Sequence, residues 1–234
     1  VTVLRNVAKE PEVVDLANFL NSIGAKVTGA GTDEIVIEGV KDLQESNFTI
    51  PADRIEAGTY LIAAAITYGN VTIKNIDSSR MNNITDHLKL SGAAISIKEN
   101  EISLDMEKSS LAPVDISTAP FPGFPTDMQA QYTVLNSLSP GSSVVSENVF
   151  ENRFMHVQEL NRMGCDIDVK GSNAFIKGVN KLTGAPVMAT DLRASASLIL
   201  AGLCAEGETI VDRIYHIDRG YEYIDEKLSQ LGLI

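Results

Sequence analysis

The chain has 234 residues, of which 44% are hydrophobic and 21% charged, and its net charge is −12 at pH 7. So acidic a surface repels phosphate backbones, which argues against nucleic acid as a partner. No apolar run approaches the roughly 20 residues of a membrane-spanning helix, so we expect no membrane partner. We expect no signal peptide either. Because the sequence opens at Val1 without a methionine, we expect it to begin inside a longer protein.

Four segments of the chain repeat one plan: a β-rich strand, a polar loop, an amphipathic helix and a glycine just beyond the helix. The glycines lie 68, 72 and 68 residues apart, at Gly24, Gly92, Gly164 and Gly232. Each follows apolar residues at helical spacing, and glycine suits this position because it adopts positive φ at little cost. Self-similarity at a regular period is typical of repeat architectures.

The other elements also recur in chain order. The strands that open the four copies are expected at 1–4, 71–74, 143–146 and 209–212. A hairpin is expected after each of the first three amphipathic helices, for example 26–28 with 35–37 around Gly29 and Gly31. More apolar helices precede three of the copies, at 54–68, 128–138 and 192–205. Their nearly all-round apolar character predicts burial, and hence a mixed α and β (α+β) fold with helices inside and sheets outside.

These repeats divide the chain into two parts. Residues 51–234 contain three copies, which we place at 51–110, 119–182 and 187–234. Residues 1–50 contain one copy without its apolar helix and are interpreted as the last, incomplete module of a preceding domain. The two cysteines, Cys165 and Cys204, form neither a disulfide framework nor a metal-ligand spacing, which favours a reducing cytoplasm.

An aspartate stands at the start of each apolar helix: Asp53, Asp127 and Asp191. Such a residue ordinarily caps free backbone N–H groups, for about 1 kcal/mol. Asp127 differs because it follows 119–126, a stiff loop with three prolines. That loop could hold a carboxylate at the edge of a cleft, where partial desolvation would raise its basicity and suit it to act as a general base.

Three arginines occupy places where a cation invites an anionic partner. Arg153 and Arg219 lie in equivalent loops, each between an opening strand and an amphipathic helix, and Arg193 lies in the first turn of an apolar helix, where its charge opposes the helix dipole. If the three converge, they form a site for phosphate and carboxylate groups, which guanidinium binds in bidentate fashion. Each could instead pair with a neighbouring acid, and the pattern alone leaves both interpretations open.

Four long blocks of sequence lie at 124–131, 149–156, 189–196 and 213–221. Together with 8–15 and 53–59, they closely resemble the UDP-N-acetylglucosamine 1-carboxyvinyltransferase family. The resemblance covers the whole chain. It implies a two-domain fold in which each domain is an inside-out α/β barrel-like assembly of three βαβαββ units. It also implies transfer of the enolpyruvyl group of phosphoenolpyruvate to the 3′-hydroxyl of UDP-N-acetylglucosamine, the committed step of peptidoglycan synthesis. The reaction passes through a tetrahedral ketal, releases inorganic phosphate, and uses no metal and no organic cofactor.

The resemblance also implies roles for individual residues. Asp127 would be the general base and would hold the sugar, and Val149 would line the sugar-nucleotide site. Arg153 and Arg219 would hold phosphoenolpyruvate, and Arg193 would add positive potential as the domains close.

Part of the family's site lies outside this sequence. Glu10 matches a family acid near the cleft. The mobile loop with the family's proton-donating cysteine is absent, and neither Cys165 nor Cys204 matches that cysteine. We therefore expect the chain alone to be inactive and to need the N-terminal part of the same enzyme as its partner. Two alternatives stay open: enolpyruvyl transfer to shikimate phosphate, and a non-catalytic repeat module that binds another protein.

Overall fold

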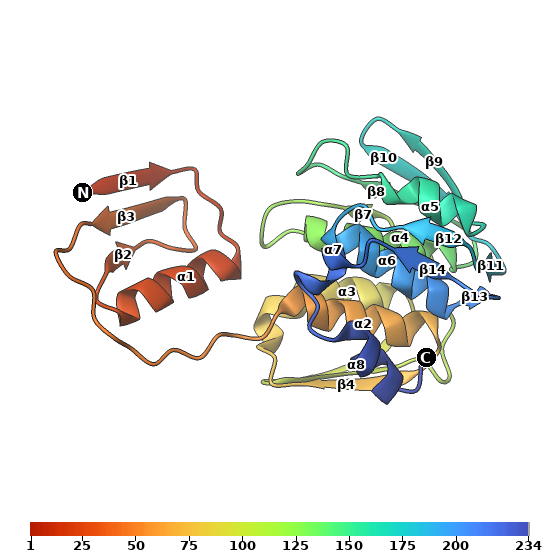
Figure 1. The fold of residues 1–234 in the computed structure, drawn as a ribbon, viewed down its shortest axis with the longest axis horizontal. Coiled ribbons are helices and arrows are strands. Elements are labelled where there is room, and N and C mark those ends of the chain that lie inside the picture. The colour runs from red at the N-terminus through yellow and green to blue at the C-terminus, as the bar shows by residue number, and fades with distance from the viewer. Residues whose placement is uncertain (234) are drawn as a thin grey trace.

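The computed structural model describes residues 1–233, which form two units joined by an extended segment (Figure 1). In the N-terminal unit one helix packs on a three-stranded antiparallel sheet of order β1-β3-β2. Its elements are β1 (Thr2–Arg5), α1 (Pro11–Ser22), β2 (Lys26–Thr28) and β3 (Glu34–Glu38). Its core is small, with Ala17, Val27 and Ile35 buried. The predicted hairpin at Gly29 and Gly31 is confirmed, since both glycines join β2 to β3 with positive φ.

Three helices lie at the centre of the C-terminal unit and contact one another: α2 (Arg54–Ile66), α4 (Gln129–Ser137) and α6 (Leu192–Leu203). Every residue of α4 is buried, as is every residue of α2 except Glu56. The predicted buried helices are therefore confirmed. Within residues 1–233, no helix is both long enough and apolar enough to cross a bilayer.

Sheets and amphipathic helices surround these central helices (Figure 1). The first sheet has the order β4-β6-β5 and the second β7-β8-β10-β9. Parallel pairs join β7 to β8, β11 to β13 and β12 to β14. The strands are β4 (Asn70–Lys74), β5 (Ala94–Lys98), β6 (Glu101–Asp105), β7 (Ile116–Ser117), β8 (Ser142–Ser146), β9 (Asp166–Lys170), β10 (Asn173–Lys177), β11 (Leu182–Thr183), β12 (Pro186–Met188), β13 (Ala205–Glu206) and β14 (Ile210–Asp212). The outer helices are α3 (Asn82–Leu90), α5 (His156–Arg162), α7 (Tyr215–Asp218) and α8 (Ile224–Gln230).

The repeat pattern predicted from glycines is present in the structure. A strand followed by a helix and an antiparallel hairpin recurs as β1-α1-β2-β3, β4-α3-β5-β6 and β8-α5-β9-β10. Gly24, Gly92, Gly164 and Gly232 follow the amphipathic helices with φ of +95°, +100°, +97° and +76°. A Cβ at Gly92 would also lie 2.2 Å from the carbonyl oxygen of Ser110. Only glycine meets both demands at that position.

Ion pairs connect the two units. Arg54 at the start of α2 binds Glu12 of α1 at 2.8 Å, and Arg80 binds Asp15 of α1 at 2.6 Å. The Arg54 side chain is only 8% exposed, so its charge depends on this partner. These contacts hold α1 opposite the start of α2.

Candidate active site

A cavity of about 1060 Å³ lies between the two units. The N-terminal unit, the connecting segment and the proline-containing loop before Asp127 all contribute to its wall. Its lining includes Asn6, Lys9, Glu10, Glu12, Asp33, Pro51, Asp53, Arg54, Arg80, Pro120, Phe121, Thr126, Asp127, Val149, Phe150 and Arg193. Residues near the starts of α2, α4 and α6 therefore meet at one space.

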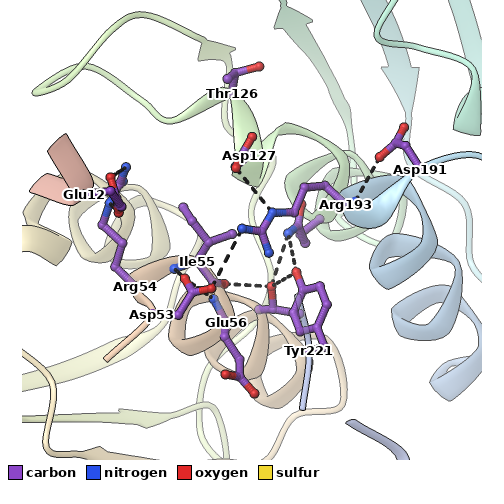
Figure 2. Close-up of polar contacts among 12 residues, drawn as sticks. Glu12, Asp53, Arg54, Ile55, Glu56, Thr126, Asp127, Asp191, Arg193 and Tyr221 are labelled. Atoms are coloured by element: carbon purple, nitrogen blue, oxygen red, sulfur yellow. Dashed lines mark hydrogen bonds and ion pairs between the residues drawn. The ribbon is translucent and has the colours of Figure 1, made fainter. Parts of the chain in front are cut away.

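Asp127 lies at the edge of this cavity between two guanidinium groups. It belongs to a short 3₁₀ turn, Thr126–Met128, that precedes α4. Arg153 Nη2 donates to its Oδ1 at 2.7 Å, and Arg193 Nε donates to its Oδ2 at 3.3 Å. Figure 2 shows Asp127 and Arg193 directed toward one another from different segments. The Asp127 side chain remains 39% exposed, so a ligand in the cavity can reach it.

The two arginines reverse the effect that burial has on this carboxyl. Burial is the largest single influence and would raise the pKa of Asp127, but the hydrogen bond from Arg153 and the positive charges of Arg193 and Arg153 outweigh it. The pKa of Asp127 is therefore held below its ordinary value. The prediction that desolvation makes this carboxylate more basic is wrong, because it left out the nearby cations.

Arg193 belongs to the first turn of α6 and has the anionic partners that its place predicted. Its Nη2 lies 3.9 Å from the Asp53 carboxylate, in addition to its bond with Asp127. The guanidinium also lies 5.3 Å from the centre of the Tyr221 ring, a cation–π distance. Its Nη1 is buried and has no hydrogen-bond partner among residues 1–233, so one donor pair is unused.

Arg153 is held in the loop between β8 and α5. Its Nη1 donates to Thr126 Oγ1 at 2.6 Å, next to the bond from Nη2 to Asp127. The Phe150 ring lies against the guanidinium, with its centre 4.9 Å from the central carbon. The side chain is 19% exposed. Arg153 is thus fixed by two acceptors and one aromatic face.

The three equivalent aspartates do not have the same partners. Asp53 accepts from the backbone N–H groups of Ile55 and Glu56 at 2.7 and 3.1 Å, and so caps α2. Asp191 caps α6 by accepting from the N–H groups two and three residues ahead, both at 2.9 Å. Asp127 makes no cap bond. The cap expected at all three positions is present at two, and the third carboxylate is directed at arginines.

The remaining predicted residues divide into two groups. Val149 and Glu10 line the cavity, and Glu10 Oε1 accepts from the backbone N–H of Phe121 at 3.2 Å. Arg219 follows α7, is exposed, does not line the cavity and forms no ion pair within residues 1–233. The structure therefore brings Asp127, Arg193, Val149 and Glu10 to one cavity. Arg153 binds Asp127 without lining the cavity, and Arg219 lies outside it.

Two polar residues of the site were missed from the sequence. Glu147, buried at the end of β8, binds Thr126 next to Asp127. Tyr221, also buried, contacts Arg193 and hydrogen-bonds Thr59 of α2 at 2.9 Å. Gln131 of α4 donates to the same hydroxyl at 3.3 Å, so this tyrosine joins all three central helices. For Glu147, the one available signal was an acid directly after an opening strand and shortly before Arg153.

The cysteines lie apart from this site. Burial raises the pKa of both the Cys165 and the Cys204 thiol to about 11. Neither is therefore a thiolate at neutral pH. Within the described part of the chain, no group of three or more His, Cys, Asp or Glu side chains is arranged to hold a metal ion.

The chain is similar to known proteins along nearly its whole length. UDP-N-acetylglucosamine 1-carboxyvinyltransferases from Coxiella burnetii (strain Dugway 5J108-111) and Hydrogenovibrio crunogenus are each 59% identical over 231 residues, which cover 99% of this chain and 53% and 55% of those proteins. The crystal structure of the enolpyruvyl transferase NikO from Streptomyces tendae matches with a TM-score of 0.86 and 28% identity, over 99% of this chain and 55% of that one.

The chain thus spans about half the length of the curated relatives it matches. The resemblance inferred from the sequence blocks is confirmed, and the neighbouring structure agrees with the expected inside-out arrangement of helices and sheets. A family model described as EPSP synthase (3-phosphoshikimate 1-carboxyvinyltransferase) matches residues 1–228. The chain therefore belongs to the EPSP synthase family.

Proposed function

We propose that the complete protein transfers the enolpyruvyl group of phosphoenolpyruvate to the 3′-hydroxyl of UDP-N-acetylglucosamine and releases inorganic phosphate. The observation that carries the proposal is the carboxylate of Asp127 between Arg153 and Arg193 at the edge of one cavity. A base beside cations suits the deprotonation of a hydroxyl next to an anionic substrate. The names of the relatives that are 59% identical support the same donor group and acceptor.

Asp127 acts in this proposal as the general base that takes the proton of the sugar hydroxyl. Its lowered pKa keeps it ionised at neutral pH, although it is then a weaker base. An anionic substrate competes with Asp127 for the guanidinium groups of Arg153 and Arg193, because both bind carboxylate and phosphate oxygens. As the arginines turn toward the substrate, the pKa of Asp127 rises and the carboxylate becomes more basic when the hydroxyl arrives.

The other residues have supporting roles. Val149 lines the part of the cavity that takes the sugar nucleotide, and the unused donors of Arg193 add positive potential where charge develops. Arg219 is assigned to phosphoenolpyruvate by its match to the family position, since it does not line the cavity in the structure. The proposed reaction has no step that requires a metal or an organic cofactor.

The proposal makes this chain one part of a two-domain enzyme. Residues 1–50 are the last module of an N-terminal domain, and residues 51–234 are a second domain of three βαβαββ modules at 51–110, 119–182 and 187–234. The rest of the N-terminal domain is the partner that supplies the proton-donating cysteine and further anion-binding residues. The reaction takes place in the cytoplasm and leads to peptidoglycan.

Phosphate release by the complete protein tests the proposal. With phosphoenolpyruvate and UDP-N-acetylglucosamine we expect turnover and an enolpyruvyl sugar nucleotide detectable by mass spectrometry, while the 234-residue chain alone gives only background. The description of the family model makes shikimate 3-phosphate the competing acceptor, so it is supplied in a parallel reaction. Turnover with shikimate 3-phosphate alone, or turnover with neither acceptor, contradicts the proposal.

A further inference from the structure

Glu147 is a buried carboxylate beneath the segments that carry the site. It lies at the end of β8 and is 2% exposed. Its Oε1 accepts from Thr118 Oγ1 at 2.9 Å and from the backbone N–H groups of Val149 and Phe150 at 2.9 and 3.0 Å. Its Oε2 accepts from Thr126 Oγ1 at 2.8 Å. A carboxylate removed from water requires such donors, and these come from three segments that meet at the cavity.

One of these bonds continues to the reacting groups. Arg153 Nη1 donates to Thr126 Oγ1 at 2.6 Å, and the Thr126 hydroxyl has a single proton, which it donates to Glu147. The direction of the chain is therefore fixed: guanidinium to hydroxyl to carboxylate. Because Glu147 fixes the hydroxyl proton, a lone pair of Thr126 stays turned toward Arg153. The other guanidinium nitrogen can then reach Asp127 at 2.7 Å.

A second connection runs through the backbone. The N–H groups of Val149 and Phe150 bind Glu147, and both residues line the cavity. The Phe150 ring lies against Arg153 with its centre 4.9 Å from the guanidinium carbon. Glu147 thus restrains Arg153 from two sides, through Thr126 and through Phe150, without lining the cavity itself.

We propose that Glu147 is a positioning residue for the transfer reaction, which holds Arg153 and the 149–150 segment in register with Asp127. This inference rests on the proposed function for the reaction that it serves. Without the carboxylate, the Thr126 hydroxyl is free to rotate and Arg153 loses one of its two fixed acceptors. The Val149 and Phe150 N–H groups also lose their buried partner. The anion-binding group then has several orientations, and only some of them suit the substrate.

Kinetics of the complete protein provide the first test. Glu147→Gln keeps the size of the side chain but replaces one acceptor oxygen by a donor, and we expect kcat/KM for phosphoenolpyruvate to fall on the order of 10- to 100-fold. In an Arg153→Ala background the same change should cost less than about threefold, since the residue acts through Arg153. Glu107→Gln, on an exposed turn after β6, is the matched control and should match wild type. Equal losses in both backgrounds would show a general structural role and overturn the proposal.

Substitution of Thr126 keeps the test decisive if Glu147→Gln does not fold. Thr126→Val removes the hydroxyl while Glu147 keeps its three other donors. We expect the same dependence on Arg153 as for Glu147→Gln. Thr126→Ser restores the hydroxyl and should recover activity to within about threefold of wild type. A Thr126→Val enzyme as active as wild type would overturn the proposal.

A spectroscopic measurement separates this inference from the proposed function. In the complete protein labelled with ¹⁵N-arginine, we expect restricted rotation of the Arg153 Nη groups in wild type and rotational averaging in Glu147→Gln or Thr126→Val. This readout needs no turnover, so it decides the positioning role even if the wild-type protein transfers no enolpyruvyl group. Unchanged Arg153 signals in both variants would exclude the role.

Discussion

The starts of α4 and α6 occupy equivalent places in neighbouring modules, yet their aspartates have different partners. Asp191 accepts two backbone N–H groups and caps α6. Asp127 accepts from two arginine side chains, 26 and 66 residues away in sequence, and caps nothing. The comparison shows how a repeat protein obtains a functional group: the carboxylate keeps its place in the module while its partners change.

The preceding loops explain the difference. Asp191 follows β12 by a short connection, and its extended backbone allows the side chain to fold over the helix start. The proline-containing loop 119–125 leads Asp127 into a 3₁₀ turn instead, and α4 then begins at Gln129 without a side-chain cap. A helix start without its cap costs about 1 kcal/mol. The uncapped helix start is thus found where the carboxylate lines the cavity instead of capping the helix.

Removal of the Asp127 carboxylate should have the largest effect. For Asp127→Asn in the complete protein we expect turnover to fall on the order of 1000-fold, because an amide cannot take the proton of a hydroxyl. Phosphate release measures the loss. A variant that keeps a tenth of wild-type turnover would show that Asp127 is not the base.

Arginine substitutions test which cations act with Asp127 in the proposed reaction. For Arg153→Gln and Arg219→Gln we expect losses on the order of 100-fold each in kcat/KM, as the proposed function requires. Their effects on stability should differ. Arg153 is bonded to Asp127 and Thr126, whereas Arg219 is exposed, so Arg219→Gln should leave the free energy of unfolding within about 0.5 kcal/mol of wild type.

Urea unfolding beside the kinetic assay separates the two arginines. A fully active Arg219→Gln enzyme would mean that Arg219 stays outside the cavity during the reaction. A loss of stability equal to that of Arg153→Gln would mean that Arg219 has a structural partner in the complete protein.

The pH dependence of stability should differ between the surroundings of Asp191 and those of Asp127. His156 is buried at the start of α5, near Asp191. Burial lowers the pKa of this histidine to about 4. The negative charge of Asp191 opposes this shift, and the positive charge of Arg153 adds to it. Between about pH 6.5 and 4 the unfolded chain therefore binds a proton that the folded chain does not. Near pH 4.5 the folded state should be less stable than at pH 7 by on the order of 2 kcal/mol from this group.

Asp127 contributes in a lower range, because its pKa is lowered and its stabilising ion pairs are lost only as pH falls below the ordinary carboxyl range. Urea unfolding at several pH values, compared between wild type and His156→Gln, measures the histidine part. An equally steep fall between pH 6.5 and 4.5 in the variant would show that His156 is not responsible.

Local features were predictable from the sequence. The glycines after helices, the apolar helices and the aspartates before them each depend on neighbouring residues, and Gly92 and Asp191 behave as these local rules require. The odd place of Arg193, a cation in the first turn of a helix, correctly indicated an anionic partner. Most of the fold follows from such rules. The choice of Asp127, Arg153 and Arg193 as site residues follows from these rules together with the family blocks.

The features that the sequence did not predict depend on contacts between residues that are far apart in the chain. The lowered pKa of Asp127 arises from residues of two other segments, so the loop sequence alone pointed in the wrong direction. Glu147 in Ser146-Glu147-Asn148 has the composition of a surface turn, and only the packing of 118, 126 and 149–150 around it makes it buried. No pattern in the sequence predicted that Arg219 would be exposed and outside the cavity.

Cap substitutions should have the smallest effect and test the comparison most directly. Asp191→Ala removes two cap bonds, and we expect the free energy of unfolding to fall by about 1 kcal/mol, while Asp191→Asn, which can still accept from both N–H groups, should lose only a few tenths. Asp127→Asn keeps an acceptor but loses the negative charge that binds two arginines, so at this position the conservative change should not rescue stability. Urea unfolding of the alanine and asparagine variants at both positions measures these four changes in the free energy of unfolding. If asparagine rescued both positions equally, the two carboxylates would have the same role, because a cap needs only an acceptor oxygen and an ion pair needs the charge.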